Sequence, residues 1–167
     1  MKILMTVASR HGGTREIGEV VAQVLRDAGH DVDEVTPDDV EHVHEYDAVV
    51  LGSAVYVGRL AAALRDLVER QGAQLRSMPV WLFWSGPVGD PPMPPTPPDD
   101  VDVVARHAGA REPRCFVGRI ERADLNLNER ALVALTRAET GDFRDFEDVR
   151  AWAAEVVEEV AALPHAR

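Results

Sequence analysis

Three nearly continuous apolar runs limit what this chain can fold into: Ile3–Val7, Ala48–Leu51 and Val80–Trp84. A strand that is apolar at successive positions needs cover on both faces, and a parallel sheet flanked by helices provides that cover. The strands predicted around these runs are 2–8, 48–53 and 79–85. Two more are predicted at 114–120 and, as a shorter and more polar edge strand, at 31–35.

Amphipathic segments lie between the strands. Apolar residues from Ile17 to Ala28 recur at helical spacing and stop at Gly29, and residues 149–160 follow the same template. Shorter helices are predicted from Leu60 to about Gly72, at 101–108, at 37–39, and around Leu132 behind a possible Asn128 cap. Strands alternating with helices imply right-handed crossovers and a doubly wound parallel sheet with helices on both faces.

Length and composition set the class of protein. The 167 residues suit a single domain spanning 1–167, and 46% hydrophobic content is enough for a full core. No apolar stretch reaches the ~18 residues of a transmembrane segment, and the N-terminus carries no signal-peptide pattern. The single cysteine, Cys115, excludes an intramolecular disulfide framework. We therefore expect a cytoplasmic protein.

The formal net charge of -11 constrains the partners. Nucleic-acid binding depends on neutralising phosphates with Lys and Arg, so nucleic acid is excluded as a partner. Electrostatic attachment to an anionic membrane is disfavoured for the same reason. Acidic charge suits a basic redox partner protein, and it equally serves solubility.

Polar loops follow three of the predicted strands, at 9–14, 53–59 and 85–90. In open α/β sheets, ligands bind outside the carboxyl ends of the strands, where the strand order reverses. The third loop continues into a proline-dense stretch, 87–98, which forbids helix and central strand. We expect that stretch to border a pocket; a ligand for a proline-recognising domain is the alternative.

The first loop, A-S-R-H-G-G-T-R-E at 8–16, has the composition of an anion site. Gly12 and Gly13 permit a tight turn, and a helix beginning near Thr14 directs unpaired N–H groups and its positive dipole end at the loop. Ser9 and Thr14 add hydroxyl donors, and the two arginines of the segment could add charge. The loop therefore predicts a phosphate cradle, with a capped turn that binds nothing as the alternative.

Other nucleotide-binding and phosphoacceptor motifs do not fit this chain. It contains no G-x-x-x-x-G-K-[ST], and G-x-G-x-x-G is missing after the first strand. A receiver domain would need acidic residues at the end of the third strand, where this chain has Leu51-Gly52-Ser53.

The first loop resembles the flavodoxin phosphate loop, roughly [ST]-x-x-G-x-T. Flavodoxins have a five-stranded sheet in the order 2-1-3-4-5 and bind FMN at the point where the strand order reverses. They are a known example of the general rule for ligand sites in such sheets. The chain also resembles the flavodoxin-like menaquinone-dependent protoporphyrinogen oxidases. The matching stretches are Ser9–Glu16, Tyr46–Gly58, Ser77-Met78-Pro79, Arg114-Cys115 and Gly141–Trp152.

The resemblance implies a set of cofactor-binding residues. The FMN phosphate would be held by Ser9, Arg10, His11, Gly12, Gly13 and Thr14. The isoalloxazine ring would be flanked by two loops, Ser53, Ala54, Val55, Tyr56, Val57, Gly58 and Ser85, Gly86, Pro87, Val88, Gly89.

Within these loops, Tyr56 is the best candidate to stack on the flavin, because an aromatic face suits a flat, electron-poor ring. The resemblance further implies that the Val57–Gly58 peptide could turn to accept the N5–H of the reduced flavin, with Gly58 making the turn inexpensive. Trp84 adjoins the third loop and could also approach the ring. The alternative role for Trp84, and the one expected for Cys115, is packing in the core.

The chain departs from the oxidase pattern at several positions. His11 stands where the motif has Asp, and Tyr56-Val57 reverses the expected Arg-Tyr order. The segment 121–145 is basic and aromatic in those oxidases but has one aromatic residue and no basic excess here. Two functions stay open. One is an oxidoreductase of heme biosynthesis type, taking electrons from a porphyrinogen and passing them to a quinone; the other is an electron carrier without its own substrate. The oxidoreductase needs an open pocket over the flavin, bordered by 87–98 and 121–145, whereas a carrier needs only an exposed flavin edge. A cofactor-free binding module is a minor third option.

Overall fold

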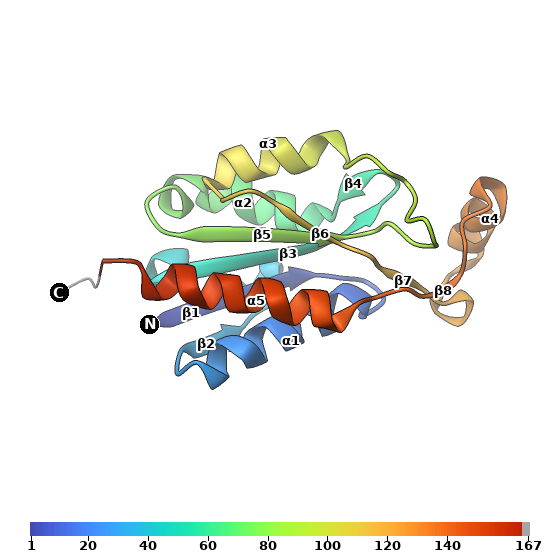
Figure 1. Cartoon of the computed structure of the whole chain (residues 1–167). Coiled ribbons are helices and arrows are strands. Elements are labelled where there is room, and N and C mark those ends of the chain that lie inside the picture. Colours follow the sequence, from blue (N-terminus) through green and yellow to red (C-terminus); the bar gives the residue numbers. More distant parts are fainter. Residues whose placement is uncertain (165–167) are drawn as a thin grey trace.

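The computed structural model describes residues 1–164 and shows a central sheet between two layers of helices (Figure 1). Its strands are β1 (Lys2–Ala8), β2 (Asp31–Glu34), β3 (Ala48–Tyr56), β4 (Arg59–Leu60), β5 (Val80–Ser85), β6 (Arg114–Phe116), β7 (Arg119–Ile120) and β8 (Gly141–Asp142). Its α-helices are α1 (Gly13–Asp27), α2 (Ala62–Leu75), α3 (Asp99–Ala108), α4 (Leu127–Thr136) and α5 (Phe146–Ala161). Short 3₁₀ turns lie at Pro37–Asp39, Val43–Glu45 and Arg122–Asp124.

The five parallel strands of the main sheet lie in the order β2-β1-β3-β5-β6. Numbered by themselves, they give the order 2-1-3-4-5, which confirms the predicted doubly wound sheet. The strand order reverses between β1 and β3, so the loops that follow these two strands open on either side of one crevice. The short strand β4 adds to this sheet by pairing antiparallel with the end of β3.

Each face of the sheet has its own core because β1, β3 and β5 direct alternate apolar side chains to opposite sides. One core packs against α2 and α3, and the other against α1 and α5. In the second, the rings of Phe83, Phe116 and Trp152 meet edge to face or tilted, with centroids 5.6–5.9 Å apart. Gly52 is required here, because an added Cβ would lie 2.4 Å from Phe83 Cζ.

The prediction of one strand at 114–120 is wrong in its second half. Only Arg114–Phe116 pair with the sheet, after which the Gly118 N–H donates to the Pro87 carbonyl at 2.7 Å. The chain then leaves the sheet as β7, which pairs antiparallel with β8. An added Cβ at Gly118 would lie 3.0 Å from Ser85 Oγ, so a glycine allows this crossing close to the end of β5.

Two helix starts also differ from prediction. Leu60 belongs to β4 rather than to the following helix, because β3 continues past residue 53 into a hairpin. The cap of α4 is Asn126, not Asn128: its side chain accepts from the Glu129 N–H, and the Glu129 carboxylate accepts from the Asn126 N–H. The capping box outweighs the asparagine two positions later, since it satisfies two unpaired N–H groups at once.

The β3–β4 hairpin turns through two residues with left-handed backbone, Val57 at φ 50 and Gly58 at φ 71. This is the two-residue turn whose twist matches antiparallel strands, and it favours Asn-Gly. A β-branched residue is strained there. Val57 is also 82% exposed, so little packing offsets the strain.

Replacing Val57 by asparagine is therefore expected to raise the free energy of unfolding by about 1 kcal/mol, because asparagine tolerates the left-handed region. Urea denaturation measures the change. Val57→Thr is the matched control: it adds polarity but stays β-branched, so no gain is expected from it. Equal stability of the two variants would contradict the strain argument.

Cys115 is not the core residue that the sequence predicts. It lies on β6, the edge strand, where the residue is exposed. The protein packed around the thiol nevertheless disfavours its charged form, and this burial raises the pKa of Cys115 to about 11. Because the thiolate is the reactive form, an accessible cysteine is kept unreactive at neutral pH.

Alkylation of Cys115 by iodoacetamide should consequently be slow in the folded protein. Two pH units separate a pKa of about 11 from the ordinary 9.0. Below pH 9 the thiolate fraction is then about a hundredfold smaller than in the unfolded chain. The rate measured against pH should rise towards pH 11 when folded and towards pH 9 in urea. Coincident profiles would refute the raised pKa.

Candidate functional site

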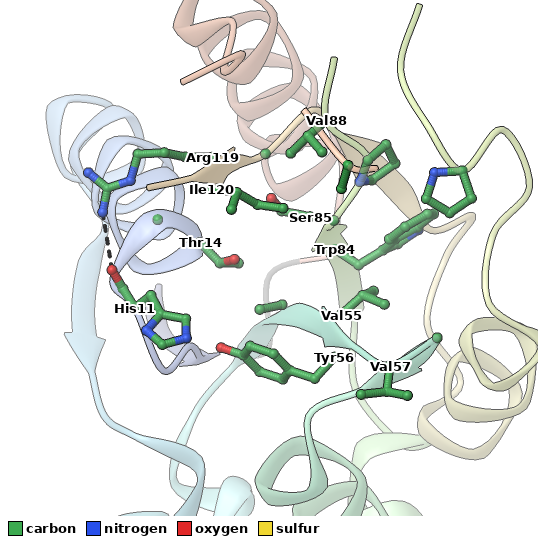
Figure 2. Close-up of a pocket in the computed structure, with 18 of the residues that line it drawn as sticks. His11, Thr14, Val55, Tyr56, Val57, Trp84, Ser85, Val88, Arg119 and Ile120 are labelled. Atoms are coloured by element: carbon green, nitrogen blue, oxygen red, sulfur yellow. Dashed lines mark hydrogen bonds between the residues drawn. The ribbon is translucent and has the colours of Figure 1, made fainter. Parts of the chain in front are cut away.

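A cavity of about 710 Å³ opens at the carboxyl ends of β1, β3 and β5. Figure 2 shows side chains from all three strand ends around it, with Tyr56 and Val57 on one side and Ser85 and Val88 on another. The residues of the predicted site that line it are Ser9, Arg10, His11, Gly13, Thr14, Ala54, Val55, Tyr56, Val57, Gly58, Ser85, Gly86, Pro87 and Val88.

Three residues of the predicted site do not line the cavity. Ser53 is fully buried, and its hydroxyl accepts from the Ala61 N–H at 2.9 Å and donates to the Ala54 carbonyl at 2.8 Å. It ties the start of α2 to β3. Gly12 and Gly89 have φ of 81° and 91°, so they shape their loops instead of contacting the cavity.

The loop between β1 and α1 presents unpaired backbone donors. Gly12 is the N-cap of α1 and has no side chain to accept from the first turn. Within residues 1–164, no protein acceptor takes the N–H groups of His11, Gly13, Thr14 and Arg15, whereas the Gly12 N–H donates to Ser9 Oγ at 3.2 Å. Such groups, together with the helix dipole, form an anion-binding site.

Two hydroxyls lie beside these amides. Thr14 is 4% exposed and lines the cavity at the start of α1 (Figure 2). Ser9 also lines it; its oxygen accepts from the Gly12 N–H, and its side chain is hydrogen-bonded to Tyr56. The loop can therefore surround a phosphate with donors although the chain carries a net charge of -11.

Arg10 does not add its charge to this cradle. Its guanidinium lies 4.4 Å from the ring centroid of Tyr56 and donates to Glu129 Oε1 at 3.0 Å. His11 Nε2 lies 3.3 Å from the same carboxylate oxygen. The Arg10 backbone N–H donates to the Tyr56 hydroxyl, whose pKa is raised by burial. This cluster joins three separate segments at one edge of the cavity.

The apolar part of the cavity lies between β3 and β5. Trp84 is 4% exposed and lines it together with Val55 and Tyr56 (Figure 2). Trp84 is thus both a core residue and a wall of the cavity, so the two alternatives in the sequence are not exclusive. The proline-dense stretch borders the same space through Val88, Met93 and Pro94, as predicted.

The segment 121–145 borders the cavity, as the enzyme hypothesis requires, but sequence analysis did not identify the lining residues of α4 and its flanks. The lining residues there are Leu125, Leu132, Val133, Thr136 and Ala138. None of the residues of α4 is buried, and Figure 1 shows the helix set apart from the two main layers. Glu129 links α4 to Arg10 and His11. The capping-box spacing of Asn126 and Glu129 was the available signal, and it predicts a helix start but not its position over the cavity.

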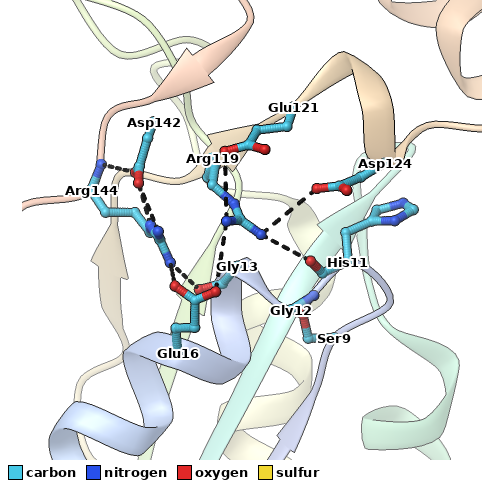
Figure 3. Close-up of polar contacts among 10 residues, drawn as sticks. All are labelled: Ser9, His11, Gly12, Gly13, Glu16, Arg119, Glu121, Asp124, Asp142 and Arg144. Carbon is cyan, nitrogen blue, oxygen red and sulfur yellow. Dashed lines mark hydrogen bonds and ion pairs between the residues drawn. The ribbon is translucent and has the colours of Figure 1, made fainter.

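Arg119 and Arg144 were also missed. They lie beside the β1–α1 loop in a network with Glu16 (Figure 3). Arg119 lies outside the stretches that match a known family, Arg144 lies within Gly141–Trp152 but had no role assigned, and each is more than a hundred residues from the loop in sequence.

Residues 1–164 give no support for a metal site or for a membrane-spanning helix. No three His, Cys, Asp or Glu side chains gather there as they would around a metal ion. None of the helices in that part of the chain has the length and apolar character to span a membrane.

Comparison with known proteins identifies the family. Residues 4–147 match the model of the flavodoxin domain. Protoporphyrinogen IX dehydrogenase [quinone] of Escherichia coli K12 is 32% identical over 81 residues, which cover 47% of this chain and 45% of that protein. The matched segment thus spans less than half of the curated relative.

Solved flavodoxins share the fold over nearly the full length. An archaeal flavodoxin is 14% identical with a TM-score of 0.65, covering 96% of this chain and 99% of that one. Oxidised flavodoxin 1 of Bacillus cereus is 18% identical, also with a TM-score of 0.65, covering 98% and 100%. The chain therefore belongs to the flavodoxin family, whose cofactor is FMN.

Proposed function

We propose that this protein is an FMN-dependent oxidoreductase with a small-molecule substrate, of the kind represented by protoporphyrinogen dehydrogenase, and that a quinone accepts its electrons. The observation that supports this proposal is the extent of the cavity. It continues beyond the three strand-end loops to α4 and to the proline-dense stretch, which leaves room for a second molecule beside the cofactor.

The residues of the β1–α1 loop fit the FMN phosphate. The unpaired amides of His11, Gly13, Thr14 and Arg15 supply several donors to one anion. The hydroxyl of Thr14, which lines the cavity, adds one more. Backbone dipoles provide the attraction here, so no excess of basic side chains is needed.

The walls formed by β3 and β5 fit the flavin ring. Tyr56 and Trp84 offer aromatic surface, and Val55 and Val88 offer aliphatic surface. Backbone groups at the Val57–Gly58 turn and at Gly86 can meet the polar edge of the ring. Bound FMN supplies the electron-accepting and electron-donating chemistry, while these residues orient it and exclude water.

The outer half of the cavity supports an apolar substrate. Its apolar lining comes from Leu125, Leu132 and Val133 and from Met93 and Pro94. A large and mostly apolar molecule such as a porphyrinogen or a quinone suits such walls better than a small charged metabolite. The name of the Escherichia coli relative, which pairs protoporphyrinogen with a quinone, points the same way.

An electron carrier is the second candidate. Two observations favour it: the fold follows flavodoxins over almost the whole chain, and the net charge of -11 suits docking to a basic partner protein. The segment 121–145 also lacks the basic and aromatic character of the oxidases that the chain resembles. A carrier needs only an exposed flavin edge.

Thr14→Val tests the phosphate cradle. Loss of a hydroxyl that donates to a charged group should weaken FMN binding about tenfold to a hundredfold. Riboflavin, which lacks the phosphate, should bind nearly as before. Quenching of flavin fluorescence on titration with the apoprotein measures both dissociation constants.

Thr6→Val is the matched control, because Thr6 is buried in β1 with an unpartnered hydroxyl and does not line the cavity. This change should leave both dissociation constants unaltered. Equal losses of FMN and riboflavin in Thr14→Val would contradict the phosphate role. Failure of the wild-type protein to bind FMN would remove the proposed function itself.

Val133→Trp separates the enzyme from the carrier by filling the outer half of the cavity. The FMN-loaded variant should oxidise protoporphyrinogen with a menaquinone analogue at least tenfold more slowly than wild type, with unchanged FMN affinity. Leu135→Trp, at an exposed position of the same helix that does not line the cavity, should keep wild-type turnover. Wild-type turnover no faster than spontaneous oxidation would favour the carrier.

A further inference from the structure

We propose that Arg119, which lines the cavity beside the β1–α1 loop, and Arg144 are positioning residues for phosphate binding: they hold two carbonyls of that loop and so direct the N–H groups that follow these carbonyls. The inference rests on the proposed binding of FMN at that loop. It assigns a role to the β7–β8 segment, which neither the phosphate-loop motif nor the flavin-flanking loops include.

Arg119 holds the peptide between His11 and Gly12. Its Nη2 donates to the His11 carbonyl at 3.1 Å (Figure 3). The side chain is only 16% exposed and comes from β7, where the chain has left the main sheet. Carboxylates of Glu16, Glu121 and Asp124 lie 3.6–3.7 Å from its guanidinium nitrogens and keep it in place.

Arg144 holds the peptide between Gly13 and Thr14. Its Nη1 donates to the Gly13 carbonyl at 3.2 Å and to Glu16 Oε2 at 2.7 Å. Asp142 binds the other side of the same guanidinium, with distances of 2.7 and 2.8 Å, and the Arg144 side chain is 5% exposed. This bidentate pair lowers the pKa of Asp142, so the carboxylate stays charged.

Because of peptide geometry, these contacts to carbonyl groups also fix the direction of the N–H groups that follow them. In a planar trans peptide the C=O and N–H bonds point in opposite directions. A carbonyl held by an arginine therefore directs the next N–H away from that arginine. For Arg144 that N–H belongs to Thr14 and has no protein acceptor. For Arg119 it belongs to Gly12, which donates to Ser9 Oγ and thereby orients the Ser9 hydroxyl.

The charge balance of this cluster indicates that the two arginines orient the loop and do not attract the phosphate directly. Two guanidinium groups face four carboxylates, those of Glu16, Glu121, Asp124 and Asp142, so the cluster has no positive excess. Glu16 lies in the first turn of α1, where its charge alone would oppose a bound phosphate. Pairing with both arginines offsets that repulsion.

The ratio of the dissociation constants of riboflavin and FMN is the readout, because the two ligands share the ring and ribityl chain and differ only in the phosphate. Arg119→Met and Arg144→Met should each weaken FMN binding about tenfold while changing riboflavin binding less than twofold. Arg119→Lys and Arg144→Lys keep a donor and a charge, so their ratios should lie between those of the Met variants and wild type.

Arg26→Met is the matched control. Arg26 lies at the other end of α1 and, like Arg144, donates to one backbone carbonyl, that of Val32; it donates to one carboxylate, that of Glu34, where Arg144 donates to two. Its loss should lower the thermal midpoint without altering the ligand ratio. Variants of Arg119 and Arg144 that fall in thermal stability but keep the wild-type ratio would show a structural role only, and would overturn the inference.

The failure of this inference is distinguishable from failure of the proposed function. Wild-type protein that binds FMN more tightly than riboflavin, with Met variants that keep this preference, refutes the positioning role alone. Wild-type protein that binds neither flavin, or both equally, refutes the phosphate site on which the role depends. Should a Met variant not fold, the Lys variants carry the same comparison.

Discussion

The unpaired backbone amides at the start of α1 are the feature on which the site depends. A helix leaves its first N–H groups without intrahelical acceptors, and here Gly12 caps the helix with its backbone alone. A serine or aspartate cap would have satisfied one of those donors from within. Leaving them free makes an anion site possible in a protein whose net charge is -11.

The rest of the domain holds that helix start where it is useful. An added Cβ on Gly18 would lie 2.6 Å from Val7 Cγ2, so α1 packs directly against the strand that precedes it. A glycine allows equally close packing at Gly52, which lies against the Phe83 ring. Close packing of this kind is stiff, and it places the strand ends of β1, β3 and β5 at one crevice with little freedom to move.

The outer half of the site is built differently. α4 contributes no buried residue and is tied to the body through Glu129, whereas the inner wall of the cavity belongs to the cores. Elements with few buried contacts open at low free energy, and binding segments are drawn from them. Under the proposed function, the rigid inner part would hold the cofactor and the outer wall would border the second molecule.

Local sequence determined the five parallel strands, except for the end of the last, together with most helices and the polar loop at 9–14, because hydrophobic periodicity and glycine placement act over a few residues. The same locality explains its errors: Asn128 was a plausible cap, but Asn126 with Glu129 satisfies more donors, and the break after Phe116 depends on the contact of Gly118 with Pro87. Only the tertiary structure decided that Arg119 and Arg144 reach the loop across 108 and 131 residues, and that α4 directs Leu132 and Val133 to the cavity. Such contacts arise from how separate segments pack, and no short pattern along the chain encodes them.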